Sequence, residues 1–432
     1  MADRLTIREL PDHVGSSATV RGWVMKSRSS GKIAFTVLRD GTGYLKCVIP
    51  KAEVSAEVWG AFERLTQEMS VSVTGEVRED ARSPGGVELG VTGVELLGKS
   101  TEFPVTPKEH GTSFLFEHRH LWLRSRKQVA IMRVRNEVIQ AIREYLYNDR
   151  FVLVDTPILT GSIGESAGTL FETEYFEFGK AFLAQTGQLY LEAAAAALGK
   201  VYSFGPTFRA EKSKTKRHLA EFWMMEPEMA WYDSNDNMRL QESLIAYVVE
   251  RCLERCGPAL TELERDVTLL QGITPPFDRI SYDDAIKMLQ DQRKETKWGV
   301  DLGADEETAL ASGRDKPVFV FNYPKKVRAF YMKENPENTD LVLNNDLLAP
   351  EGYGEIIGGS QREDDLDRLL ARIREEELPE EAYGWYLDLR RYGTFVHSGF
   401  GLGIERTVAW ICGIPHIREA IAFPRMMTKL YP

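Results

Sequence analysis

A chain of 432 residues is too long for one ordinary hydrophobic core, so its length predicts two domains. An apolar share of 43% and a charged share of 28% are typical of a globular protein, and no apolar run approaches the length of a membrane span. The net charge of −11 argues against a nucleic-acid partner only if it is spread evenly.

The charge is not spread evenly. Residues 1–100 carry 13 basic and 13 acidic side chains, so the rest of the chain carries the whole −11. Residues 21–46 hold one acid, Asp40, and six cations: Arg21, Lys26, Arg28, Lys32, Arg39 and Lys46. A local basic strip of this kind can attract a polyanion to an acidic protein.

Four scattered cysteines without a C-x-x-C pair predict neither a zinc site nor a disulfide framework. The N-terminal sequence MADRLTIREL lacks the apolar segment of a signal peptide. We therefore expect a cytoplasmic protein with no membrane partner.

The N-terminal region, residues 1–98, reads as five short strands with one helix after the third. Turn signals such as DGTG at 40–43 and PGG at 84–86 separate the strands. The expected strands are 18–28, 32–40, 44–49, 70–79 and 87–97, and the expected helix is 56–67. This order predicts an OB-fold β-barrel, a common binder of single-stranded nucleic acid. Its rings Trp23, Phe35 and Tyr44 are candidates either for base stacking or for the barrel core.

A phosphate-loop pattern, G-x-x-x-x-G-K-S at 93–100, is rejected because strand-forming residues fill it and no helix follows. Residues 99–123 contain two prolines and no periodicity, which predicts a hinge between the barrel and a second domain at 124–432. That domain opens with helical spacing over 124–148 and a strand-like run at 151–157 that ends in proline.

A hairpin at 201–231 carries the strongest signal for chemistry. Its two strand-like runs flank a basic loop at 212–218. One face of the second run, from Trp223 to Trp231, is apolar, whereas the other carries Phe222, Glu226 and Glu228. Composition alone is consistent with a solvated hairpin, but an arginine such as Arg209 beside a ring also suits a nucleotide.

Three further segments carry polar residues beside glycines. GSIGESAG at 161–168 is a loop with one acid, Glu165, and EIIGGSQR at 355–362 places an acid and an arginine around two glycines. SGFGLGIER at 398–406 reads as a strand that enters a helix. Residues 234–316 are acidic and helical, and we predict no site residue there.

The hairpin sequence resembles motif 2 of the class II aminoacyl-tRNA synthetases, in the aspartyl, asparaginyl and lysyl subgroup. It reads F-R-A-E, then a basic loop, then R-H-L-A-E-F. The helix and proline-ended strand resemble motif 1, and the segment at 398–406 resembles motif 3. The resemblance covers nearly the whole chain. It implies an α+β protein with an OB-fold and a catalytic domain on an antiparallel sheet flanked by helices, acting as a homodimer.

The resemblance also implies the site. Arg209 and Arg406 would be the catalytic residues, and ATP would be bound by Arg209, Glu211, Arg217, His218, Phe222, Glu355 and Arg406. Mg²⁺ would be held by Asp346 and Glu355. The amino acid would meet Glu165, Gln188, Glu226 and Arg362, and the tRNA anticodon would meet Phe35, Arg28 and Lys46.

The expected reaction is ATP-dependent activation of an amino acid and its transfer to the 3′ end of a tRNA, releasing AMP and pyrophosphate. Such a reaction needs alignment and relief of negative charge, because the attacking carboxylate is already an anion. Aspartyl members usually carry lysine where this chain has Leu191 and aspartate where it has Glu226. These changes disfavour a carboxylate, so we expect L-asparagine and tRNA(Asn).

Three alternatives remain open. The chain could be an aspartyl member of the family, strict or non-discriminating. It could be a tRNA-independent asparagine synthetase on the same scaffold, although such enzymes lack the N-terminal barrel. A non-catalytic RNA-binding protein would be expected to have lost residues such as Arg209, Glu355 or Arg406, and all three are present.

Overall fold

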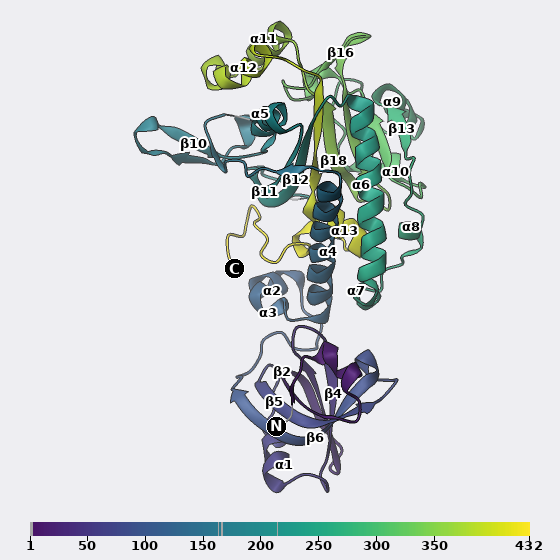
Figure 1. Cartoon of the computed structure of the whole chain (residues 1–432). Coiled ribbons are helices and arrows are strands. Elements are labelled where there is room, and N and C mark those ends of the chain that lie inside the picture. Colours follow the sequence, from purple (N-terminus) through teal and green to yellow (C-terminus); the bar gives the residue numbers. More distant parts are fainter. Residues whose placement is uncertain (1–2, 163, 166, 214) are drawn as a thin grey trace. The chain divides into compact units, whose positions relative to one another are not determined.

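The computed structural model of the chain describes residues 3–162, 164–165, 167–213 and 215–432 (Figure 1). Contacts between residues divide it into two compact units, Met1–His118 and Arg119–Pro432. The predicted hinge at 99–123 straddles this division. Of the loop predicted at 161–168, residues 163 and 166 lie outside the described residues, as does Lys214 of the basic loop.

The first unit is a barrel of five long strands. They are β2 (Ser17–Ser29), β3 (Ile33–Arg39), β4 (Tyr44–Pro50), β5 (Ser70–Glu79) and β6 (Val87–Gly98). The barrel closes because β2 pairs with both β3 and β5, and β4 runs parallel to β6. A two-residue strand, β1 (Asp3–Arg4), adds to β2. The predicted OB-fold, with its helix between the third and fourth strands, is confirmed.

Side chains of the barrel strands alternate between core and surface. In β4, Leu45, Cys47 and Ile49 are fully buried while their neighbours are partly exposed. The helix α1 (Ala56–Glu63) begins where the Ser55 side chain accepts the Val58 N–H. It is shorter than the predicted 56–67. The rejected phosphate-loop pattern lies in β6, as a strand.

The second unit is built on an eight-stranded sheet in the order β13-β14-β17-β18-β19-β12-β11-β7. Its strands are β7 (Val152–Leu153), β11 (Lys200–Phe208), β12 (Glu221–Ala230), β13 (Asp278–Ser281), β14 (Val318–Phe321), β17 (Asn344–Ala349), β18 (Gly354–Gln361) and β19 (His397–Gly403). The six central strands are antiparallel, whereas β7 and β13 at the two edges pair in parallel. The predicted antiparallel floor is confirmed.

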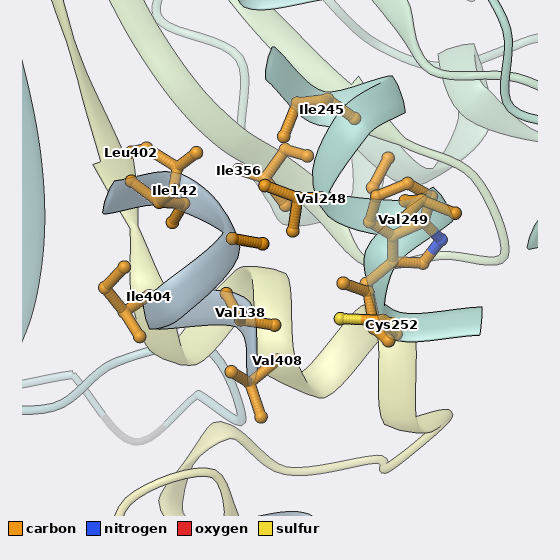
Figure 2. Packing of buried hydrophobic residues seen from close by; sticks show 14 of the residues in the cluster. Val138, Ile142, Ile245, Val248, Val249, Cys252, Ile356, Leu402, Ile404 and Val408 are labelled. Atoms are coloured by element: carbon orange, nitrogen blue, oxygen red, sulfur yellow. The ribbon is translucent and has the colours of Figure 1, made fainter. Parts of the chain in front are cut away.

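Two long helices, α4 (Arg126–Asn148) and α6 (Ser234–Arg255), run side by side along one face of this sheet (Figure 1). The helix α13 (Ile404–Cys412) packs with them, and Figure 2 shows Val138 and Ile142 of α4 meeting Ile404 and Val408 of α13. The apolar spacing of α4 predicted this face. Burial of such side chains stabilises each by about 1.5–3 kcal/mol.

Shorter elements complete the second unit. The helices are α3 (Arg119–Trp122), α5 (Gln188–Leu198), α7 (Gly257–Glu262), α8 (Thr268–Gln271), α9 (Tyr282–Asp291), α10 (Ala304–Ala311), α11 (Leu366–Glu375) and α12 (Gly384–Arg391). The small sheets are β8 (Leu159–Thr160), β9 (Glu172–Glu174) and β10 (Lys180–Leu183), and β15 (Glu334–Asn335) with β16 (Asn338–Val342). The first unit ends with α2 (Thr112–Glu117).

The four cysteines are free and buried. Among the described residues, no helix combines the length and the apolar character needed to cross a bilayer.

Candidate active site

Three neighbouring strands form the floor of the site. β12 lies between β11 and β19, so residues of the predicted hairpin face the segment at 398–406 directly. Glycines on β19 make this approach possible, because a Cβ on Gly401 would lie 2.1 Å from Cε of Met224. The prediction that Trp231 continues the apolar face is wrong. Its ring is 75% exposed, because the strand ends at Ala230 and Trp231 has a left-handed φ of 68°.

One pocket lies over this floor. Its lining includes every residue predicted to bind ATP: Arg209, Glu211, Arg217, His218, Phe222, Glu355 and Arg406. They come from the hairpin formed by β11, the basic loop and β12, from β18, and from the first turn of α13. Three stretches that are far apart in the sequence therefore supply one surface.

The rings and cations of the pocket are already paired. The guanidinium of Arg209 lies 5.4 Å from the ring centroid of Phe222, a cation–π contact. Nη1 of Arg406 donates to both the backbone oxygen and Oε2 of Glu355, at 2.9 Å each. A nucleotide would therefore meet positive groups that are held in position, one beside the ring and one across β18.

His218 and Glu211 face each other, with Nε2 3.4 Å from Oε2. Burial and the positive charge of Arg406 lower the pKa of His218, which favours the neutral ring. A neutral imidazole can donate one hydrogen bond to an anion but adds no full charge.

The carboxylates of Asp346 and Glu355 converge beside Gly358. A Cβ on Gly358 would lie 2.9 Å from Oε1 of Glu355 and 3.6 Å from Oδ1 of Asp346, so the missing side chain leaves both oxygens a shared space. Burial raises the pKa of Asp346 to about 7, although Arg328, whose Nη2 lies 2.5 Å from Oδ2, opposes the shift. Converging carboxylate oxygens are the ligands that Mg²⁺ prefers, so these residues fit a divalent cation.

Burial would also raise the pKa of Glu355, but Arg406 and Arg328 more than offset it and lower the pKa overall. The carboxylate of Glu355 is thus ionised and paired with the guanidinium of Arg406. The pKa of Asp346 stays raised because Arg328 only partly offsets the burial of its carboxyl group.

Sequence reasoning missed Glu307, on α10. Its Oε2 accepts from Nη1 of Arg217 at 3.1 Å and from the backbone N–H of Glu355 at 3.0 Å. Burial and the charge of Glu355 raise its pKa to about 7. Nothing in the run DEE at 305–307 distinguishes this acid from its neighbours, because only the packing of α10 against β18 selects it.

A second group of buried charges lies farther along the floor. The guanidinium of Arg362 grips Glu228 through Nε at 3.0 Å and Nη2 at 2.9 Å, and its Nη1 donates to Ser360 at 2.7 Å. The side chains of Arg362 and Glu228 are 4% and 0% exposed. Gly399 is required here, because its Cβ would lie 2.1 Å from Oε2 of Glu228.

Glu226 lies two residues before Glu228 on β12, closer to the pocket lined by Phe222. It accepts from the Thr186 hydroxyl and from the backbone N–H of Gly187 at 2.9 Å. Burial raises its pKa despite these two bonds. Glu226 thus remains hydrogen-bonded but is short of positive charge.

Glu165 lies at the rim, where Oε1 accepts from the Tyr331 hydroxyl at 3.1 Å and lies 4.0 Å from Nη2 of Arg209. Gln188 is turned away toward its own helix, donating to Glu192 at 2.9 Å. The structure therefore places Glu165, Glu226 and Arg362 around the floor, whereas Gln188 supports Glu192 behind it.

Glu192 anchors a fully buried network beneath Glu228. It accepts from Arg390 at 2.8 Å, from the Tyr386 hydroxyl at 2.7 Å and lies 2.9 Å from Nε2 of His397. Burial opposes its ionisation, but Arg390 and His397 lower its pKa. This network was also missed, because its members come from α5, α12 and β19 and form no local motif.

In the barrel, Phe35 is flanked by two cations. The guanidinium of Arg28 lies 5.1 Å and Nζ of Lys46 5.9 Å from its ring centroid. Lys46 also pairs with Asp80 at 2.9 Å and Glu88 at 2.7 Å. The three residues predicted to meet the anticodon therefore form one surface cluster on β2, β3 and β4.

Comparison with known proteins assigns the family. The profile described as tRNA synthetases class II (D, K and N) matches residues 112–427, and the profile of the OB-fold nucleic acid binding domain matches residues 18–97. The chain belongs to the class II tRNA synthetases of the aspartate, lysine and asparagine group.

Full-length relatives narrow the position within this class II group. Two proteins named asparagine–tRNA ligase, from Symbiobacterium thermophilum and Chloroflexus aurantiacus, are 54% and 55% identical, with 99% of this chain and at least 98% of each relative covered. The structure of asparaginyl-tRNA synthetase from Pyrococcus horikoshii complexed with asparaginyl-adenylate superposes with a TM-score of 0.96 at 47% identity, covering both chains fully. The enzyme from Entamoeba histolytica superposes at 0.89 and 31% identity, also over both full chains.

Proposed function

We propose that this class II synthetase activates L-asparagine with ATP to asparaginyl-adenylate and transfers the asparaginyl group to the 3′ end of tRNA(Asn), releasing AMP and pyrophosphate. The full-length relatives named asparagine–tRNA ligase support this choice of amino acid. The observation that carries it is the ion pair between Arg362 and Glu228 at the buried end of the floor.

That ion pair neutralises Arg362, the guanidinium that we expect a substrate side chain to meet there. Glu226, buried and short of positive charge, lies beside it. An aspartate side chain would add a carboxylate to a region whose cation is already committed, and desolvated like charges repel strongly. A carboxamide is neutral, so it can accept from Arg362 and donate to Glu226 without that cost.

Leu191 supports the same conclusion. It is fully buried in an apolar cluster with Ala195 and Val201. A lysine could not replace it without burying an unpaired ammonium there. This position therefore does not supply the cation with which aspartyl members would balance a substrate carboxylate.

ATP occupies the pocket over the floor in this proposal. Phe222 and Arg406 border the purine, while Arg209, Arg217 and His218 meet phosphates. Mg²⁺ fits the converging carboxylates of Asp346 and Glu355 and would supply charge neutralisation at the phosphates. Arg209 and Arg406 align the α-phosphate for attack by the asparagine carboxylate.

The proposal extends to assembly and tRNA binding. The edge strand β7 exposes Val152 and Leu153, at 42% and 44%, next to unpaired strand edge, which is consistent with a homodimer formed through motif 1. Phe35 with Arg28 and Lys46 would stack and hold an anticodon base. We place the activity in the cytoplasm, where translation consumes its product.

Exchange of radiolabelled pyrophosphate into ATP tests the assignment. We expect exchange that depends on asparagine and is far weaker with aspartate at equal concentration. Exchange with aspartate alone would make the chain an aspartyl member, and ammonia-dependent formation of free asparagine from aspartate would make it an asparagine synthetase. Sedimentation of the wild type against Val152→Asp tests the dimer, which the charge at the edge should dissociate.

A further inference from the structure

Arg217 is one of the cations predicted to meet the ATP phosphates, yet here it is fully occupied by protein. Nη1 donates to Oε2 of Glu307 at 3.1 Å and to the backbone oxygen of Ala304 at 3.3 Å. Nη2 donates to Oγ1 of Thr308 at 2.7 Å and to the backbone oxygen of Gly352. These four bonds account for all four hydrogens on the two terminal nitrogens.

The holding group is α10 together with the turn before β18. The Thr308 hydroxyl donates to the backbone oxygen of Ala304 at 2.7 Å, which fixes its orientation. The backbone oxygen of Ala304, Oε2 of Glu307 and Oγ1 of Thr308 thus lie on one helical turn and form a preorganised socket for the guanidinium. The socket has no spare room. Gly354, with φ of 70°, would place a Cβ 2.4 Å from Nη1 of Arg217 and 2.3 Å from Oε2 of Glu307.

Arg217 nevertheless lines the nucleotide pocket. A phosphate oxygen that approaches the two terminal nitrogens of this guanidinium can bond to them only by displacing an existing acceptor. Glu307 is the acceptor best suited to leave. It is the one carboxyl group among these four acceptors, and it keeps the backbone N–H of Glu355 as a partner at 3.0 Å.

We propose that Glu307 is a positioning residue that competes with the terminal phosphates of ATP for Arg217. Without nucleotide, α10 holds the guanidinium at the edge of the pocket. A triphosphate exchanges with Glu307 as its counter-ion, whereas a nucleoside monophosphate, which lacks the β- and γ-phosphates, leaves the pair intact. This inference rests on the proposed use of ATP.

The test is equilibrium binding of ATP and AMP, each with Mg²⁺ and without amino acid, measured by calorimetry on the full-length protein. Glu307→Gln removes the competing charge and is expected to lower the Kd of ATP about three- to fivefold, the effect of one partly exposed ion pair, while the Kd of AMP is unchanged. Glu306→Gln is the matched control. It makes the same charge change on the same helical turn, and the Glu306 carboxylate lies by Gly303 instead.

Thr308→Val provides a second variant that changes no charge. It removes one uncharged acceptor of Arg217, so ATP should tighten by about twofold and AMP should not, as expected for one modest hydrogen bond. Inorganic tripolyphosphate used as a competitor should follow ATP in each variant.

Weaker or unchanged ATP binding by Glu307→Gln would overturn the inference, and weaker binding would mean that Glu307 instead prepares Arg217 for phosphate. Equal shifts for ATP and AMP, or an equal shift in Glu306→Gln, would also overturn it, since general electrostatics would then suffice. Failure of the wild-type protein to bind ATP at all would count against the proposed function itself.

Discussion

The two ends of the active-site floor differ in how deeply their ion pairs are buried. At the end proposed to bind the nucleotide (the nucleotide end), Arg406 and Glu355 form a pair whose side chains are 27% and 32% exposed. At the end proposed to bind the amino acid (the amino-acid end), Arg362 and Glu228 are almost completely buried, with Arg390 and Glu192 paired behind them at 1% and 0% exposure. The same sheet thus carries a partly exposed pair at one end and enclosed pairs at the other.

The difference matches what each end must do. A partly exposed pair is worth less than a buried one, and fully exposed pairs contribute only about 0–1 kcal/mol, so a polyphosphate and a divalent cation would replace its partners at a lower cost. Breaking a buried pair by removing one partner costs about 3–5 kcal/mol, so the buried end keeps one arrangement. In the proposed function, the nucleotide end would therefore exchange partners, and the amino-acid end would discriminate between similar side chains.

The largest effect is expected from Glu228→Gln. It leaves the buried Arg362 without its counter-charge and should lower the free energy of unfolding by about 3–5 kcal/mol. Urea unfolding followed by tryptophan fluorescence measures this. Glu254→Gln is the control, because it breaks the pair of Glu254 with Arg251 in which the Glu254 side chain is 57% exposed, and should change stability by about 1 kcal/mol at most. Equal losses in both variants would erase the contrast between the two ends.

Arg209→Ala tests the nucleotide end. Removing one group that stabilises charge in the reacting complex should slow pyrophosphate exchange at least about 100-fold. The fold should tolerate the change, because Arg209 is partly exposed, so tRNA binding measured by filter retention should be nearly unaffected. Arg209→Lys, which keeps the charge but loses the planar fork, should fall between the two. Parallel losses of exchange and tRNA binding would contradict the role given to Arg209.

Phe35→Ala tests whether tRNA binding by the barrel can be changed without affecting amino-acid activation in the catalytic unit. Loss of a stacked base costs about 1–3 kcal/mol, which should raise the KM for tRNA by about five- to 150-fold and leave pyrophosphate exchange unchanged. Phe35→Tyr keeps the ring and should behave like the wild type. If exchange also fails in Phe35→Ala, the ring is part of the barrel's packing.

The smallest effect is expected in the pH dependence of stability, which Asp346 at the nucleotide end should influence. Asp346 has its pKa raised to about 7, so between about pH 4 and pH 7 the folded protein holds a proton that the unfolded chain has lost. Stability without Mg²⁺ should therefore decline as pH rises through this range and level off above it, by at least about 1 kcal/mol for this one group.

Thermal unfolding at pH 5 and pH 8, compared between the wild type and Asp346→Asn, isolates that contribution. The variant cannot ionise, so its stability should depend less on pH. Addition of Mg²⁺ should stabilise the wild type more at pH 8 than at pH 5. Identical pH profiles for the two proteins would show that Asp346 does not hold the proton.

Much of this architecture could be predicted from the sequence because local patterns encode it. Alternation in the barrel strands and the spacing of Val134, Val138 and Ile142 on α4 report directly which face is buried. Much of the pocket could be predicted because its lining residues lie in sequence motifs. Arg209 directly follows the end of β11, and Arg406 lies three residues after Gly403, the end of β19. The prediction for Trp231 was wrong because the alternation of apolar residues continues in the sequence beyond Ala230, where the strand ends.

The unpredicted residues share a different property. Glu307, Glu192 and Arg390 gain their roles from contacts between elements that are distant in the sequence. Asp305, Glu306 and Glu307 are alike as acids at the start of a helix, and only tertiary packing distinguishes them. Tertiary selection of this kind leaves no trace in a single sequence.

The position of β19 also bears on how the enzyme is made. This strand, His397–Gly403, lies between β12 and β18 near the middle of the catalytic sheet, yet it is synthesised after the other seven strands of that sheet. The barrel can close while translation continues, whereas the sheet must wait with a central gap until the ribosome has delivered residues 397–403. The catalytic sheet is therefore completed only after all of its other strands have been made, and its exposed half-sheet is the stage at which chaperones would be needed.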